Sequence, residues 1–106
     1  MIYRGCVFSR DIQIIERTSG LPLNISTFQF EGALRTDNGD VVMNISSQSG
    51  HFSVFNGEQG WFRFILTPAQ TQALPLGALS SALYRTDAPE GRVRLAAMKV
   101  QVRDQD

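Results

Sequence analysis

The segment Trp61–Thr67 constrains the fold of this chain more than any other part of the sequence. Three large apolar side chains stand at alternate positions and would share one face of an extended strand: Phe62, Phe64 and Leu66. The opposite face would carry a second mixed set that still contains apolar groups: Trp61, Arg63 and Ile65. Apolar side chains on both faces are typical of a strand in the middle of a sheet. The segment therefore predicts a central β-strand.

Two segments before this strand are predicted to form a β-hairpin. Phe28–Arg35 and Val41–Ser47 both alternate between apolar and polar side chains. Between them, Asn38 and Gly39 offer the positive φ angle that a tight turn requires. The order of strand, Asn-Gly turn and strand indicates an antiparallel pair.

The remaining sequence predicts four more strands and one short helix. The strands are Val7–Glu16, His51–Phe55, Ala78–Arg85 and Arg92–Val102. Thr67 followed by Pro68 and Gln70 has the pattern of a capping box with proline at the first helical position, so Pro68–Leu74 is predicted to be helical. In the last strand the apolar side chains change from odd to even positions, which predicts a bulge or a change of sheet near Ala97.

These elements define the expected fold class as all-β. Short strands recur at spacings of roughly ten residues, which gives about seven strands in one domain spanning residues 1–106. Parallel crossovers would need more helix than the sequence offers. An antiparallel sandwich of two sheets is therefore the expected architecture.

Composition excludes several function classes. Hydrophobic residues make up 42% of the 106 residues, the formal net charge is zero and the pI is about 6.6, so we expect binding neither to nucleic acid nor to a membrane. No apolar run approaches the length that spans a bilayer, and the N-terminus lacks the pattern of a signal peptide. Cys6 is the only cysteine, which fits a reducing cytosol.

Residues that could carry chemistry are few. His51, the only histidine, has Ser49 and Ser53 nearby but no activating motif, so we interpret it as a turn or strand-edge residue, and a hydrolase ranks lowest among the functions considered. Cys6 is interpreted as a small buried or interface hydrophobe. The acidic stretch Asp37–Asp40 is followed by apolar residues and is interpreted as a turn rather than a calcium loop. A pair of carboxylates that meets only in space stays open.

Trp61, flanked by Arg63, is the best candidate for contact with a ligand. Aromatic side chains stack on sugars and on bases in known binding modules. Packing in the core or at an interface is the more common use of tryptophan in a sandwich. The alternative function is therefore a carbohydrate-binding module that uses Trp61 with Tyr84 or Phe62.

From Asp11 onward several stretches share a pattern with a known family. They are Gly20–Ser26, Phe28-x-Phe30 with Leu34 and Arg35, the hairpin into Val41–Ile45, the strand and short helix of Phe64–Gly77, and the closing strand Gly91–Val102. On these the chain resembles a family of small structural proteins of tailed bacteriophages and prophages, which itself resembles the immunoglobulin-like N-terminal domain of phage baseplate upper proteins. The chain departs from the family in lacking aromatic residues and an aspartate after Gly77, where Leu79, Ser81 and Ala82 stand, and in carrying Met98 in place of a glycine.

The resemblance implies an antiparallel immunoglobulin-like β-sandwich that acts as a non-enzymatic virion structural protein. It would be a capsid cement or decoration protein, or a component attached to the neck, tail or baseplate. Its partners would be the major capsid protein or neck and tail proteins, together with further copies of itself in a homo-oligomer. The protein would be made in the bacterial host cytoplasm and carried in the virion. No catalytic, cofactor-binding or metal-binding residue carries over from the family.

Chain ends normally fray unless something holds them. Within this hypothesis we expect neighbouring subunits to hold the arm Met1–Phe8 and the otherwise solvated tail Arg103–Asp106. Deletion of the arm is then expected to weaken assembly more than folding.

Overall fold

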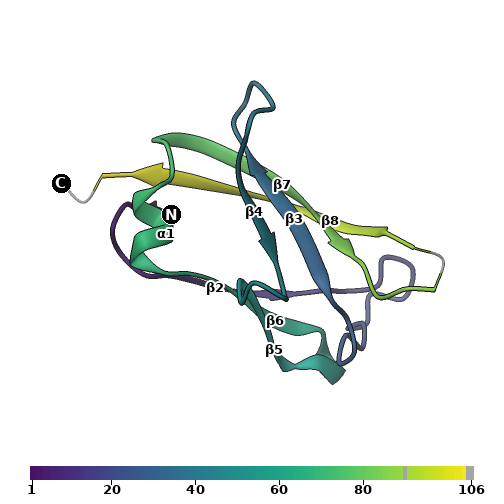
Figure 1. Ribbon diagram of the computed structural model, residues 1–106. Helices are drawn as coiled ribbons and strands as arrows, with labels where there is room; N and C mark the ends of the chain where they lie inside the picture. The colour runs from purple at the N-terminus through teal and green to yellow at the C-terminus, as the bar shows by residue number, and fades with distance from the viewer. Residues whose placement is uncertain (90, 105–106) are drawn as a thin grey trace.

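The computed structural model describes residues 1–89 and 91–104, which form a mostly-β body with one short α-helix (Figure 1). Glu90 of the predicted last connection and Gln105 and Asp106 of the predicted tail lie outside these residues. The described part contains eight strands in two sheets, one more than the sequence predicts. The mostly-β fold class is confirmed.

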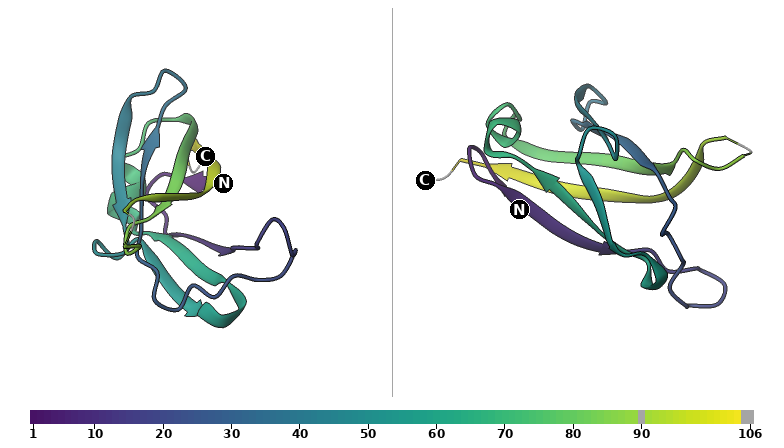
Figure 2. Two further views of the ribbon diagram at one scale, coloured as in Figure 1. Left: turned by 90° about the vertical axis from the view of Figure 1, so that its right-hand side faces the viewer. Right: turned by 60° about the horizontal axis from the view of Figure 1, so that its bottom comes forward.

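The larger sheet has five strands in the order β1-β8-β7-β3-β4. Their bounds are Ile2–Tyr3 (β1), Val93–Arg103 (β8), Gly77–Arg85 (β7), Phe30–Arg35 (β3) and Val41–Ser46 (β4). The last four strands of this order pair antiparallel in succession, whereas β1 pairs parallel with β8. The sheet is therefore mixed, and it curls around the core like half a barrel (Figure 2).

The smaller sheet has three antiparallel strands in the order β2-β6-β5. Their bounds are Phe8–Gln13 (β2), Trp61–Leu66 (β6) and Phe52–Asn56 (β5). The prediction that the segment beginning at Trp61 is a central strand is confirmed, because β6 pairs on both sides. Its inward side chains are fully buried.

The predicted hairpin is confirmed as β3 and β4. These strands pair antiparallel, and Gly39 in the connecting turn has a φ angle of 91°. The backbone N–H of Gly39 donates to the carbonyl oxygen of Thr36 at 2.9 Å, which closes the turn. The segment Asp37–Asp40 is thus a turn, as its sequence predicts.

The helix α1 spans Pro68–Gln72, and a 3₁₀ turn, η1, spans Gly57–Gln59. The capping box at α1 is confirmed. Thr67 Oγ1 accepts a hydrogen bond from the Gln70 backbone N–H at 3.2 Å, and Gln70 Oε1 accepts from the Thr67 N–H at 2.8 Å. Thr71 on the inner face is fully buried, and its hydroxyl donates to the carbonyl oxygen of Cys6 at 2.8 Å. The helix is therefore fastened to the N-terminal segment.

The expectation that both sheets are wholly antiparallel is wrong at β1. Ile2 and Tyr3 pair parallel with Val102 and Arg103, and the Ile2 side chain is 0% exposed. A strand of two residues is too short to show alternation, so no periodicity reveals it. Contacts within this chain are enough to hold the N-terminal segment in place, because Ile2 and Phe8 are both part of the hydrophobic core. Removal of Met1–Phe8 would therefore damage folding directly.

The change of parity in the last strand is confirmed as a bulge, centred two residues earlier than predicted. Leu83 pairs with Ala96 and Tyr84 pairs with Arg94, which leaves Leu95 as the extra residue on β8. After the bulge, three side chains of β8 point into the core: Met98, Val100 and Val102.

The core lies between the two sheets and is rich in phenylalanine. Phe64 on β6 stands edge-on to Phe8 with ring centroids 5.7 Å apart, and stacks on Phe52 at 5.3 Å. Aliphatic side chains from the larger sheet, the segment after α1 and the segment before β3 complete the cluster: Ile2, Ile25, Leu34, Ile45, Leu74, Leu79, Leu83 and Val102. Both sheets therefore depend on one hydrophobic core.

Candidate functional surface

His51 lies in the connection between β4 and β5, and its side chain is buried. Its Nδ1 accepts a hydrogen bond from the backbone N–H of Ser46 at 3.1 Å, and its Nε2 lies 3.1 Å from Nε2 of Gln70 on α1. Both ring nitrogens thus face amide groups rather than the nucleophile and carboxylate that a hydrolytic triad requires. The turn location agrees with the sequence interpretation, whereas the burial was not predicted.

Burial also determines the charge of this ring. Removal from water lowers the pKa of His51 below its ordinary value, because the charged form loses its hydration. Since Nδ1 accepts from a backbone amide, it carries no proton. His51 therefore joins the β4–β5 connection to α1 as a neutral ring.

Cys6 lies between β1 and β2 and is partly buried. Its backbone holds the local structure: the N–H donates to the carbonyl oxygen of Tyr3 at 3.1 Å, and the carbonyl oxygen accepts from the hydroxyl of Thr71. The side chain is therefore not fully buried, and the interpretation of Cys6 as an interface hydrophobe stays a prediction.

Several acidic side chains are paired with arginine. Four ion pairs occur among the described residues: Arg4–Asp104, Arg63–Asp11, Arg85–Asp87 and Arg92–Glu31. The bonded guanidinium groups hold the pKa of Asp11 and of Asp87 below the ordinary value. Within residues 1–89 and 91–104, no three of histidine, cysteine, aspartate and glutamate gather closely enough to hold a metal ion.

The outer face of the smaller sheet carries an aromatic pair. Trp61 is half-buried there, with its ring centroid 6.2 Å from that of Phe55, which is 50% exposed. The guanidinium of Arg63 lies 4.9 Å from the Phe55 ring and is bonded to Asp11 at 2.7 Å. We call Phe55, Trp61 and Arg63 the aromatic platform.

Two residues predicted to join Trp61 lie elsewhere. Phe62 is fully buried in the core, so the prediction that it contacts a ligand is wrong. Tyr84 belongs to β7 in the larger sheet, where the guanidinium of Arg92 lies 3.8 Å from its ring. Phe55 lies on the outer face with Ser53, as the alternation along β5 places it. It was missed because its contact with Trp61 depends on the pairing of β5 with β6.

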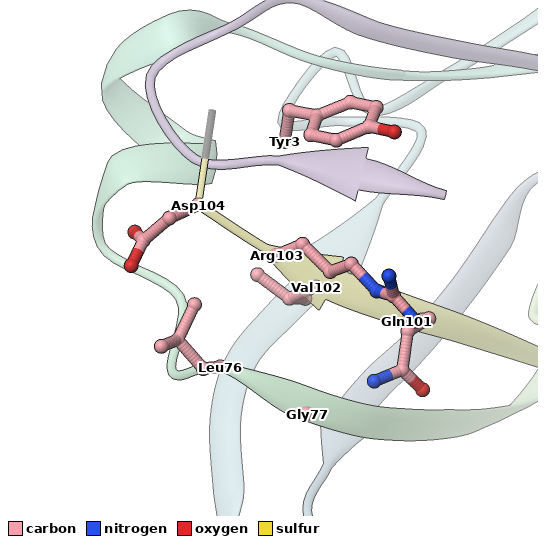
Figure 3. A pocket seen from close by; sticks show the side chains of 7 residues that line it. All are labelled: Tyr3, Leu76, Gly77, Gln101, Val102, Arg103 and Asp104. Carbon is pink, nitrogen blue, oxygen red and sulfur yellow. The ribbon is translucent and has the colours of Figure 1, made fainter. Parts of the chain in front are cut away.

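A shallow depression lies on the outside of the larger sheet where β1, β8 and the start of β7 meet (Figure 3). It has a volume of about 540 Å³ and is lined by Tyr3, Leu76, Gly77, Gln101, Val102, Arg103 and Asp104. Tyr3 is 46% exposed and Leu76 is 54% exposed. We call this area the terminal depression. It combines exposed apolar groups with a polar rim, as contact surfaces between proteins do.

A second depression, of about 700 Å³, lies where the end of the smaller sheet faces the larger one. One side is formed by Ile14, Ile15, Arg17 and Leu23, which follow β2, and the other by Arg94, Leu95, Ala96 and Ala97 of β8. We call it the seam. Figure 2 shows β2 and β8 diverging toward this end of the molecule.

Comparison of the sequence with models of known protein families gave no match, and a search of curated proteins gave none either. The resemblance to the phage family thus stays a prediction from the motifs quoted above. No helix in the described part of the chain is long and apolar enough to cross a membrane. The molecule is defined by its own structure as a small mostly-β module with exposed apolar groups at the aromatic platform, the terminal depression and the seam.

Proposed function

We propose that this chain is a non-enzymatic structural module of a tailed-bacteriophage particle and acts by docking onto other proteins. The observation that carries the proposal is the terminal depression, where Tyr3 and Leu76 expose large apolar surfaces beside Arg103 and Asp104. Exposed apolar groups with a polar rim mark sites of protein contact. The resemblance in sequence to the phage family is the reason for proposing a bacteriophage particle as the place of that contact.

The module is proposed to be a variant of the immunoglobulin-like sandwich. Its two sheets enclose one core, and strands β7 and β8 form the longest antiparallel pair of the larger sheet. The parallel strand β1 is then an addition that ties the N-terminus beside the chain end. Formal neutrality favours a repeated module, because many copies can lie side by side without strong mutual repulsion.

Mass analysis of purified particles tests this function. The proposal expects the chain at a fixed, repeated copy number relative to the major capsid protein, whereas absence from washed particles would overturn it. Copy number also separates the two placements: hundreds of copies favour a capsid cement or decoration protein, and a few to a few tens favour the neck, tail or baseplate. A host cytoplasmic protein measured in the same preparation controls for carry-over.

The aromatic platform supports a second candidate, a carbohydrate-binding module. Phe55 and Trp61 offer neighbouring rings on one accessible face, and Arg63 offers hydrogen-bond donors beside them. Because Trp61 is the only tryptophan, its fluorescence reports contact at this face directly. A glycan array should then show binding that Trp61→Ala removes and Leu76→Ala leaves intact. An array without any bound glycan would reject the carbohydrate-binding candidate and leave docking as the remaining proposal.

A further inference from the structure

Strand β8 has an edge that is largely uncovered. It runs for 11 residues, but β1 pairs only with Val102 and Arg103 at its end. Within residues 1–89 and 91–104, no other strand pairs with β8 on the side away from β7. The first part of this uncovered stretch, from Arg94 to Ala97, lines the seam. An open edge of this kind is a template for an additional strand.

A hydrogen bond shows which way the backbone of this edge points. The carbonyl oxygen of Lys99 accepts from Nη1 of Arg10, a side chain on β2, at 3.2 Å. Because alternate residues of a strand direct their backbone groups to the same side, Ala97 presents its N–H and C=O toward the seam as well. Arg10 thus occupies the Lys99 carbonyl oxygen, which is the acceptor that a backbone N–H of an added strand would use.

The seam offers apolar surface for the side chains of such a strand. Leu95 and Ala96 are partly buried on the β8 side, and Leu23 is partly buried on the opposite side. Ile15 beside it is 52% exposed. Burial of this surface would add to the backbone hydrogen bonds of an incoming strand.

Charge indicates the chemistry of the partner. Four exposed basic side chains surround the uncovered edge: Arg10, Arg17, Arg94 and Lys99. Of the acids nearby, Asp11 is bonded to Arg63. Glu16, whose hydrogen-bond partner is the neutral hydroxyl of Thr18 at 2.9 Å, remains as one acidic group against these four basic ones. An extended segment with acidic side chains would complement this edge. A second copy of β8 would instead bring Arg94 and Lys99 against the same basic groups.

Two of the other edge strands, β4 and β5, are less suited to addition. The register shift between β3 and β4 leaves Val42 as an extra residue, and the shift between β5 and β6 leaves Phe55. Bulges of this kind twist an edge away from further pairing. On β8, the stretch from Ala96 to Val100 follows the bulge and continues in regular register with β7.

We propose that the edge of β8 from Ala96 to Val100 is a strand-addition site that binds an extended acidic segment of a partner protein. The inference rests on the proposed docking function and names the contact by which docking is made. The added strand pairs with the backbone of Ala97 and Lys99, displaces Arg10 from the Lys99 carbonyl oxygen, and places apolar side chains in the seam.

Amide NMR of the full chain with a short synthetic peptide tests the proposal. The probe alternates valine with glutamate, and the matched control replaces every glutamate with lysine. The acidic probe should shift the amide resonances of Ala97 and Lys99 and slow their hydrogen exchange, and the effect should weaken at high salt. Shifts confined to β4 or β5, or equal binding of both peptides, would overturn the proposal.

Two variants separate pairing from general damage. Ala97→Pro removes an N–H that faces the seam rather than β7, so the fold should persist while binding of the acidic probe falls by about fivefold to tenfold. Lys99→Glu keeps the backbone and reverses one charge. It should weaken binding of the acidic probe and strengthen binding of the lysine control peptide. Unchanged binding in folded Lys99→Glu would contradict the role of charge.

The same measurements keep this proposal distinct from the proposed function. A chain that occurs at fixed copy number in particles but binds no acidic strand keeps its structural role and loses the strand-addition site. A chain that binds the acidic probe but is absent from particles keeps the site and loses the virion role.

Discussion

The ring of Phe30 on β3 stacks on the ring of Phe62 on β6, with centroids 4.6 Å apart and an angle of 19° between the planes. The two residues belong to different sheets, and both are almost fully buried. The stack is therefore a direct link between the sheets, which share no backbone ladder in the part of the chain that the structure describes. Because both sheets depend on this aromatic core, a cavity made within it should affect the whole module.

Phe64→Ala should lower the free energy of unfolding by about 3–5 kcal/mol. Phe64 is 0% exposed and packs against Phe8 and Phe52, so the substitution removes contacts and leaves a cavity. Chemical denaturation measures the change. Phe55→Ala on the outer face of the same sheet is the control and should cost far less. An unchanged melting temperature for Phe64→Ala would contradict the assignment of this face to the core.

Gly60→Ala should destabilise the protein more than Gly39→Ala does. Both glycines have positive φ angles, of 78° and 91°, so both substitutions strain the backbone by about 1 kcal/mol. A Cβ at Gly60 would also meet the carbonyl oxygen of Ile14, whereas a Cβ at Gly39 would meet open space. Thermal unfolding of the two variants gives the comparison. Equal losses would show that the contact with Ile14 relaxes without cost.

Acid should weaken the fold through His51. Its pKa is lowered in the folded chain by burial, so between the ordinary value of 6.5 and the lowered one the unfolded chain binds more protons. This contribution to stability is complete above pH 6.5 and is lost as the pH falls toward the folded pKa. The paired carboxylates Asp11 and Asp87 have pKa values below 3.8, so their protonation lowers the stability of the fold only in stronger acid.

Denaturation at a series of pH values checks this assignment. The wild-type chain should lose stability as the pH falls below 6.5, and His51→Gln, which keeps an amide near Ser46 and Gln70 but does not titrate, should lose that slope. A slope that persists in the variant would assign the titration to another group.

The sequence predicts the strands whose alternation runs for several residues. Phe62, Phe64 and Leu66 could be assigned to one buried face because a strand repeats every two residues. The capping box of Thr67 and Gln70 located α1 because its pattern spans only four neighbouring residues. These features need no knowledge of the rest of the chain.

Features made by contacts between distant residues could not be predicted. Ile2 is buried in the core because its strand pairs with Val102 and Arg103, one hundred positions away in the sequence. Phe55 and Trp61 become neighbours because β5 pairs with β6, and the His51 side chain is buried because α1 packs beside the β4–β5 connection. The candidate surfaces therefore emerge from tertiary packing, while the strands that carry them are visible in the sequence.

Substitutions in the N-terminal arm should separate folding from assembly. Ile2→Ala removes a fully buried side chain that joins β1 to the core, and should lower the free energy of unfolding by about 2–5 kcal/mol. Tyr3→Ser changes an exposed side chain in the terminal depression, so its stability should stay within about 0.5 kcal/mol of the wild type. If this depression is the docking surface, Tyr3→Ser should nevertheless reduce the copy number recovered in purified particles. Gln101→Ser, in the same depression but without an aromatic ring, is the matched control and should reduce the copy number less. Full incorporation of Tyr3→Ser would place the docking contact on another part of the surface.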